Sequence, residues 1–203
     1  MNDLKDFTNF NGNYIHPTAI INWDRVSMGT GNIIYPYACI GTDAQHPRED
    51  SNGVIEIGDN NIFREYVTVH LPTAHSKLTK IGSDCYLMVL AHVAHDCIVE
   101  DNVRISNNTV LSGHVHVMNH AVLGLNCNIH QFQVIGSYAM LGMGTVVGAN
   151  SKIIPGKVYI GANAKGLKEN TIGLERNNVT PETLQSEIAR FQKLYQDLTP
   201  SSF

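Results

Sequence analysis

The sequence predicts a left-handed parallel β-helix of hexapeptide repeats, followed by a short C-terminal helical segment. From residue 81 to residue 153 every sixth residue is aliphatic: Ile81, Leu87, Val93, Val99, Ile105, Leu111, Val117, Leu123, Ile129, Ile135, Leu141, Val147 and Ile153. Neither a helix, with period 3.6, nor an ordinary strand, with period 2, produces a strict period of six. A second run of small or slim side chains follows four residues after these positions, and only Gln133 interrupts it.

These two runs have a steric explanation. Each hexad forms one short strand and a tight turn, and three hexads close one triangular coil. The aliphatic side chains then fill the interior of the prism, and the small residues fit its corners. Stacked coils bury each other's faces, as in other solenoids. We expect about seven coils over residues 1–160 and a C-terminal extension over 161–203.

Composition narrows the functional classes. Charged residues make up 16% of the 203 residues, below the roughly 25% of an average domain, which suits flat faces that associate with other copies. A net charge of −4 gives no support for nucleic-acid binding. Three of the four cysteines fall in the corner run, so we interpret them as packing residues of a reduced, cytoplasmic protein. The N-terminus has no apolar run typical of a signal peptide, and no stretch is long enough for a membrane span.

The repeat has two interruptions and a defined end. Residues 1–13 are polar and predict a loose lead-in, after which the hexad phase begins at Ile15. The polar stretch 42–53 predicts a loop from a corner of the prism, and such loops often carry function. The phase breaks again over 71–80 and then continues without a miss until Pro155 and Gly156 close the repeat.

The C-terminal extension contains one clear helix. Residues 163–176 have a mixed pattern and predict a short helix or a loop. Thr180, Pro181 and Glu182 form a good helix start, and an apolar stripe follows at Leu184, Ile188, Phe191, Tyr195 and Leu198. We therefore expect a helix over about 181–198, buried against the prism or a neighbouring subunit. The flat faces of the prism favour a closed homotrimer.

Histidines cluster in the regular part of the repeat. Six of the ten lie between residues 92 and 130, and none occupies the interior register: His92, His95, His114, His116, His120 and His130. A single such histidine is commonly just a polar turn residue. However, His95 and His114 are 19 residues apart, which places them on adjacent coils at one corner, about 5 Å apart. A stack of imidazoles at one edge suits proton transfer near neutral pH.

The neighbours of these histidines complete a catalytic set. Asp96 follows His95 and can orient its imidazole, and Gly113 precedes His114 and can offer a backbone N–H to an oxyanion. No serine or cysteine nucleophile is well placed. The set therefore predicts direct acyl transfer, in which His95 deprotonates a hydroxyl or amine that attacks a thioester.

Four stretches carry a specific resemblance: EIGDNNIFREYVTVH (56–70), LMVLAHVAHDC (87–97), SNNTVLSGHV (106–115) and IHQF (129–132). Over roughly residues 15–176 the chain resembles the UDP-N-acetylglucosamine acyltransferases that begin the lipid A synthesis of lipopolysaccharide. The resemblance implies a homotrimer that takes a 3-hydroxyacyl chain from acyl carrier protein and needs no metal or other cofactor. It implies His95 as general base, Asp96 as its partner and Gly113 as oxyanion donor.

The same resemblance implies a set of substrate contacts. His92, His114 and Gln131 would lie near the sugar and His130 beside the acyl thioester path, with further contacts from Gln45, Asn163, Asn170 and Arg176. The chain departs from the family in the acceptor region. His46 and Arg48 replace an acid and a lysine, Ala164 replaces a histidine, and Ile172 replaces a glutamate. The chain is also shorter than the family members, but its catalytic set is retained.

Two further features concern the acyl donor. Met143 stands where family members that accept long chains have glycine, so we expect Met143 to limit acyl length; its alternative role is to fill a gap in the packing. The segment 152–176 carries five basic residues against Glu169 and Glu175: Lys152, Lys157, Lys165, Lys168 and Arg176. This patch suits an acidic carrier protein or coenzyme A, or it is an ordinary solvated surface.

Two acceptors and one other class of enzyme remain open at this point. The acceptor is either the 3-hydroxyl of UDP-N-acetylglucosamine or a group, such as an amine, of a modified sugar nucleotide of surface polysaccharide. The alternative class is a zinc-dependent hydratase, because some hexapeptide-repeat trimers, the γ-class carbonic anhydrases, hold zinc through three histidines. The spacing of His92 and His95 does not match that ligand set, and a non-catalytic scaffold does not explain the His95, Asp96 and Gly113 set.

Overall fold

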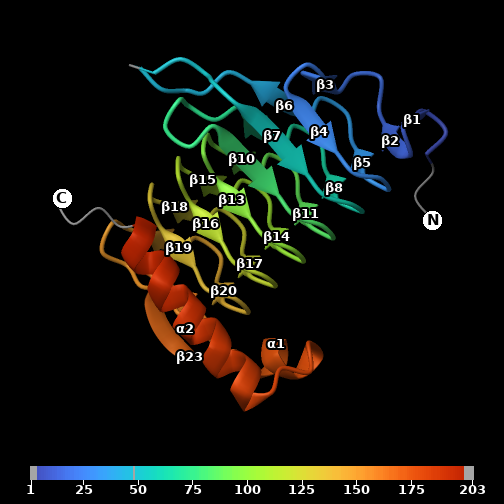
Figure 1. Cartoon of the computed structure of the whole chain (residues 1–203). Coiled ribbons are helices and arrows are strands. Elements are labelled where there is room, and N and C mark those ends of the chain that lie inside the picture. Colours follow the sequence, from blue (N-terminus) through green and yellow to red (C-terminus); the bar gives the residue numbers. More distant parts are fainter. Residues whose placement is uncertain (1–3, 48, 199–203) are drawn as a thin grey trace.

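The computed structural model describes residues 4–47 and 49–198, which form a left-handed parallel β-helix with two helices at its C-terminal end (Figure 1). The predicted fold class is thus confirmed. Three sheets form the faces of a triangular prism, and residues 18 apart pair in successive coils, as Leu87 does with Ile105. The predicted interior residues from Ile81 to Ile153 are at most 1% exposed.

Each face is named by one of its strands. Face A contains β11, face B contains β12 and face C contains β13. Face A consists of β1 (Thr8–Phe10), β2 (Asn13–Ile15), β5 (Ile33–Ile34), β8 (Ile62–Phe63), β11 (Tyr86–Leu87), β14 (Arg104–Ile105), β17 (Val122–Leu123), β20 (Met140–Leu141), β22 (Lys157–Ile160) and β23 (Lys165–Glu169). Face B consists of β3 (Ile20–Ile21), β6 (Cys39–Thr42), β9 (Thr68–His70), β12 (His92–Val93), β15 (Val110–Leu111), β18 (Asn128–Ile129) and β21 (Val146–Val147). Face C consists of β4 (Val26–Met28), β7 (Val54–Ile57), β10 (Leu78–Ile81), β13 (Ile98–Val99), β16 (His116–Val117) and β19 (Val134–Ile135).

The two ends of the prism differ from the sequence expectation. The lead-in is not wholly loose, because β1 folds back as an antiparallel hairpin on β2. At the other end, β23 pairs antiparallel with β22, so sheet structure continues past residue 160. Residues 163–176, expected as a short helix or a loop, contain the short helix α1 (Thr171–Arg176), but the strand β23 that precedes it was not expected. The edge strand β22 offers free backbone groups, which explains why β23 adds to it.

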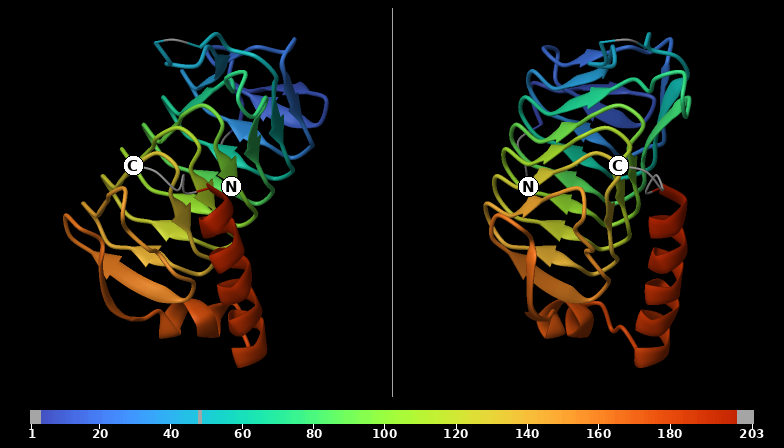
Figure 2. Two further views of the ribbon diagram at one scale, coloured as in Figure 1. Left: turned by 60° about the vertical axis from the view of Figure 1, so that its left-hand side comes forward. Right: turned by 90° about the vertical axis from the view of Figure 1, so that its left-hand side faces the viewer.

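Helix α2 (Pro181–Leu198) runs alongside face C, as both views in Figure 2 show. Phe191, only 2% exposed, packs with Met118 and Val134 of that face. Two hydrogen bonds also connect the helix to the prism. The Ser137 hydroxyl donates to the Glu187 carboxylate, and the Arg190 guanidinium donates to the Glu100 carboxylate. The expected short C-terminal helix is therefore present, and its apolar stripe faces its own prism, with Phe191 buried and the other stripe residues half-buried. Among the described residues, no helix is long and apolar enough to cross a membrane.

Two loops leave the corner between faces B and C, here called the BC corner. The first connects β6 to β7 over 43–53 and the second connects β9 to β10 over 71–77. The two loops are hydrogen-bonded to each other. The Asn52 N–H donates to the Pro72 carbonyl at 2.9 Å, and Ser51 forms an antiparallel bridge with Thr73. Both loops thus lie at the corner that carries His95 in the next coil.

Candidate active site

The BC corner stacks the candidate catalytic residues in columns 18 residues apart. His95, Gly113 and Gln131 form one column, and the next residue of each turn, Asp96 or His114 among them, has a left-handed backbone with φ near 60°. Backbone bonds fix the stack, since the His114 N–H donates to the His95 carbonyl at 3.1 Å. The regular coil therefore brings together residues that are far apart in sequence.

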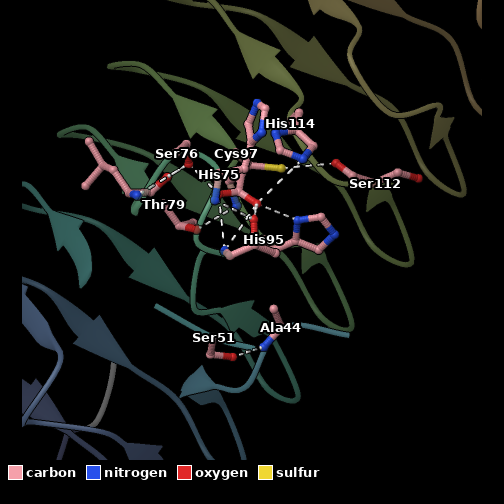
Figure 3. A network of polar contacts seen from close by, with 12 residues as sticks. Ala44, Ser51, His75, Ser76, Thr79, His95, Cys97, Ser112 and His114 are labelled. Atoms are coloured by element: carbon pink, nitrogen blue, oxygen red, sulfur yellow. Dashed lines mark hydrogen bonds and ion pairs between the residues drawn. The ribbon is translucent and has the colours of Figure 1, made fainter. Parts of the chain in front are cut away.

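The carboxylate of Asp96 is the centre of a hydrogen-bond network. Figure 3 shows residues of this network and its surroundings, among them Ser76, Thr79 and His95. Its Oδ2 lies 2.7 Å from Nδ1 of His95 and accepts the hydroxyl of Thr73 at 2.8 Å. Ser76 also donates its hydroxyl to this carboxylate, and the backbone N–H of Asp96 donates to Thr79 at 3.0 Å. Burial alone would raise the pKa of Asp96, but the donors from His95, Ser76 and Thr73 outweigh it and lower that pKa well below its usual range.

His95 has little freedom of position. Its ring lies against Gly113, where a β-carbon would be only 2.3 Å from Cε1 of the imidazole. It is 8% exposed, and its carbonyl accepts the backbone bond from the next coil. Within the described ranges the Gly113 N–H donates no hydrogen bond, so it is free to meet a developing charge next to the imidazole.

A second pair of histidines lies beside this centre. His92 shares a hydrogen bond of 2.7 Å with the hydroxyl of Thr68, and its ring centroid is 4.8 Å from that of His70. His70 is 5% exposed and its Nδ1 has no partner in the described part of the chain. Burial, together with His92 and His95, lowers the pKa of His70 to about 4, and burial also lowers the pKa of His92. Both rings are therefore neutral at pH 7.

The two loops add histidines that face the centre. The ring of His46 meets that of His95 edge-on at 5.6 Å, and the ring of His75 meets that of His114 at 5.1 Å. His114 also lies 5.2 Å from His95 and stacks on Phe132 at 4.4 Å, all between ring centroids. Burial lowers the pKa of His114 more than Asp96 raises it. Sequence reasoning did not place Thr73, His75 and Ser76 here; their only signal is that they interrupt the hexads just before the catalytic coil.

The predicted substrate residues occupy three separate places in one chain. His92, His114, His130 and Gln131 lie at or beside the BC corner, and Gln45 lies exposed in the first loop. Arg48 falls outside the described residues. Asn170 and Arg176 line a groove of about 140 Å³ at the corner between faces C and A, with His120 and Tyr138. Met143, 76% exposed, is at the corner between faces A and B, and Asn163 is in the turn between β22 and β23.

The structure also shows the surroundings of the basic residues in segment 152–176 and of the four cysteines. Within the predicted patch, the ammonium of Lys152 lies 5.2 Å from the centroid of the Tyr195 ring of α2. Lys152 therefore makes a cation–π contact within its own chain. Lys165 and Lys168 lie on the exposed strand β23. All four cysteines are free thiols, and burial raises the pKa of Cys97 to about 12, which keeps it protonated and unreactive.

Comparison with known proteins finds similarity to hexapeptide-repeat acyltransferases. The family model described as bacterial transferase hexapeptide (six repeats) matches residues 78–113. A UDP-N-acetylglucosamine O-acyltransferase of Synechocystis, named for its acyl-carrier-protein donor, is 35% identical over 178 residues, which are 85% of this chain and 62% of that protein. The corresponding protein of Psychromonas ingrahamii is 44% identical over 84 residues, 40% of this chain and 32% of that protein. The chain thus matches less than two thirds of the length of these curated relatives.

Solved structures give the same result for the fold. The UDP-N-acetylglucosamine acyltransferase of Bacteroides fragilis superposes with a TM-score of 0.79 at 28% identity, over 94% of this chain and 79% of that one. The Arabidopsis enzyme superposes with a TM-score of 0.73 at 27% identity, over 95% and 74% of the two chains. The similarity therefore covers nearly the whole of this chain, and not only its repeats.

Proposed function

We propose that this chain is a shortened, divergent member of the hexapeptide-repeat family that includes the UDP-N-acetylglucosamine acyltransferases, and that it is itself an acyltransferase. It moves an acyl group from a thioester to a hydroxyl or amine of a nucleotide-linked amino sugar. The observation that carries this proposal is the buried pair of His95 and Asp96, whose Nδ1 and Oδ2 are 2.7 Å apart, against the backbone of Gly113.

The chemistry follows from the state of the pair. Asp96 is ionised, so the Nδ1–H of His95 donates to it and the Nε2 lone pair is left to act as base. His95 takes the proton of the acceptor as its oxygen or nitrogen bonds to the thioester carbon. The Gly113 N–H donates to the oxyanion of the tetrahedral intermediate. The carbon–sulfur bond then breaks, and His95 returns the proton to the leaving thiolate.

The acyl donor and the acceptor sugar are also proposals. We propose a 3-hydroxyacyl donor on acyl carrier protein, with coenzyme A as the alternative carrier, and no cofactor. UDP-N-acetylglucosamine is the first acceptor to test. The departures from the family in the acceptor region, at His46, Ala164 and Ile172, give weight to an amino-sugar nucleotide as the second. Four free thiols suit the reducing cytoplasm.

A homotrimer completes the proposal. The Asn170 and Arg176 groove and Met143 lie at other corners than His95, and a contact between copies can bring such corners together. We therefore assign the acceptor nucleotide and the acyl chain to sites shared by two subunits. Co-expression of His95→Ala and Arg176→Ala chains tests the sharing: mixed trimers should recover activity that neither variant has alone. If each variant alone is inactive and the mixed trimers are inactive as well, the complete site lies within one subunit.

A transfer assay read by mass spectrometry tests the activity. The purified chain is given 3-hydroxyacyl thioesters of different lengths, on carrier protein and on coenzyme A, with UDP-N-acetylglucosamine or amino-sugar nucleotides. We expect an acylated sugar nucleotide that His95→Ala abolishes. Ester formation identifies a hydroxyl acceptor, and amide formation only on the amino sugar identifies the alternative. Absence of any product with every pair, or full activity of His95→Ala, would contradict the proposal.

A further inference from the structure

The catalytic pair is also part of a compact group of metal-binding side chains. One potential ligand atom from each of His95, Asp96 and His114 lies within 4.8 Å of the other two, and these residues are buried or half-buried. We propose that this group binds a zinc ion, and that bound zinc inhibits the acyl transfer proposed above. The binding stands by itself, whereas the inhibition rests on the proposed function.

The distances suit one small ion. Asp96 Oδ2 lies 2.7 Å from His95 Nδ1 and 3.6 Å from His114 Nε2. Zinc bonds to nitrogen and oxygen ligands are about 2.0–2.2 Å long, so two ligands of one tetrahedral ion are separated by roughly 3–4 Å. The three side chains thus need only small rotations to share an ion.

A fourth ligand is available from the loop above. The ring of His75 lies 5.1 Å from that of His114, centroid to centroid, and His75 is in the exposed part of the loop 71–77. A turn of its side chain brings a ring nitrogen toward the same point. Two or three imidazoles with one carboxylate form a nitrogen-rich set, which favours zinc over magnesium or calcium, because those ions prefer oxygen.

The carboxylate is already held in the way that metal ligands are held. Thr73 donates its hydroxyl to Asp96, and Ser76 donates a second one. Such outer hydrogen bonds orient ligands in metal sites, and their loss commonly costs 10- to 100-fold in affinity. Both donors belong to the chain itself, in the loop 71–77. The carboxylate is therefore held in position without a bound substrate.

The group can be reached from solvent. A cavity of about 330 Å³ is lined by His75, Asp96, His114, Phe132 and, from the end of α2, Asp197 and Leu198. It is large enough for a hydrated ion, and Asp197 places a second negative charge on its wall. The cavity therefore supplies an entry path from the side of α2.

Zinc in this position removes the catalytic base. It competes with the Nδ1–H of His95 for the carboxylate that orients the ring, and it takes up imidazole lone pairs. An enzyme that used zinc would show the opposite response, because its activity would require the ion. The sign of the zinc effect therefore separates inhibition from the hydratase alternative.

Binding is measured first, without turnover. The full chain is treated with EDTA, dialysed and titrated with ZnCl₂ by calorimetry and with CoCl₂ by visible absorption, which reports nitrogen coordination. We expect one ion per chain, about tenfold weaker binding in His75→Gln and loss of the site in His114→Gln. The matched control is His16→Gln, a histidine of the first coil, which should bind zinc like the unaltered chain. Failure of the unaltered chain to bind below 1 mM, or equal binding by all variants, overturns the site.

Transfer is then measured in EDTA and at rising zinc. We expect full activity in EDTA, inhibition with a midpoint near the calorimetric Kd, and reversal by added EDTA. Relative to its own activity in EDTA, His75→Gln should need about tenfold more zinc for half inhibition. Zinc that binds but raises activity, or gives carbon dioxide hydration, overturns the inhibition. A chain that binds zinc but never transfers an acyl group refutes the proposed function and leaves the metal site standing.

Discussion

The imidazole of His95 touches the backbone of Gly113, one coil further along the prism. A β-carbon on Gly113 would lie 2.3 Å from Cε1 and 2.7 Å from Nε2 of that ring, closer than real β-carbons approach. Glycine is needed here because of this contact and not because of its backbone conformation, since no positive φ occurs at residue 113. The position of the His95 imidazole thus depends on the absence of a side chain in the next coil.

Gly113→Ala should therefore displace the ring while the prism remains folded. We expect kcat/KM for acyl transfer to fall by about 100-fold, because misplacing a catalytic group by about 1 Å commonly costs that much. The measurement is the transfer assay, with circular dichroism to check the fold. Gly148→Ala is the matched control, since a β-carbon there meets nothing within 4 Å. Equal activity of the two alanine variants would show that the ring position does not limit the reaction.

Asp96→Asn keeps the shape of the orienting residue and removes its charge. In the proposed mechanism the carboxylate stabilises the imidazolium that forms when His95 takes a proton, and an amide cannot do so. By analogy with the loss of the aspartate in serine-protease triads, we expect kcat to fall by roughly 10²–10⁴-fold. Steady-state kinetics at saturating substrate measure this change.

The control for charge removal is Asp24→Asn, at an exposed turn of the first coil, which should leave kcat unchanged. An Asp96→Asn enzyme within twofold of the unaltered chain would mean that the carboxylate is a structural acceptor for Thr73 and Ser76, and not a partner in proton transfer.

The sequence was sufficient for the prism because steric demands repeat in every coil. A six-residue period from Ile81 to Ile153 has one structural solution, and the 19-residue separation of His95 and His114 follows from the coil length. Their ring centroids, 5.2 Å apart, lie at the expected spacing. Helix α2 was equally visible, because a capping start and an apolar stripe are local signals.

The parts that sequence could not predict are those where the repeat is interrupted. Thr73 and Ser76 donate to Asp96 from a loop without periodicity, and their position depends on pairing with the first loop, through Ser51 and Thr73. The strand β23 was missed for a similar reason. Its residues are all exposed, so it has no hydrophobic pattern and forms only because β22 offers an open edge.

His70 should make the stability of the chain depend on pH. Burial keeps this imidazole neutral, with the pKa lowered from 6.5 to about 4. The unfolded chain therefore binds a proton between these values that the folded chain does not, and the free energy of unfolding falls as pH falls from about 6.5 to about 4. At about 1.4 kcal/mol per unit of pKa, the contribution of His70 is at most about 3–4 kcal/mol.

Urea unfolding from pH 7.5 to pH 4.5 at one protein concentration measures this slope. His70→Gln should have a shallower slope than the unaltered chain. His92, His114 and His120, whose pKa values burial also lowers, contribute to the slope that remains, and Asp96 and Glu100 add to it at the acid end. The control His16→Gln should retain the full slope. Identical slopes in the His70→Gln and unaltered chains would mean that His70 becomes protonated without opening the fold.

Met143 should set the length of the acyl chain. It is 76% exposed in the single chain, so its thioether does not fill a gap in its own prism. Under the proposed trimer it would instead contact the acyl groove between subunits, where its bulk shortens the space for the chain. Met143→Gly should shift the preferred 3-hydroxyacyl donor to a longer chain by several carbons, with little change in activity toward short donors.

Competition between donors of different lengths, read by mass spectrometry, measures this preference. Met143→Leu is the matched control, because it keeps a side chain of similar volume and should keep the original preference. The glycine also frees backbone conformations at this corner, so the stability of both variants is compared by thermal unfolding. A preference that is unchanged in Met143→Gly, with stability retained, would show that another residue ends the groove. A preference that shifts equally in Met143→Leu would mean that the shape or the sulfur of this side chain, and not its bulk, determines length.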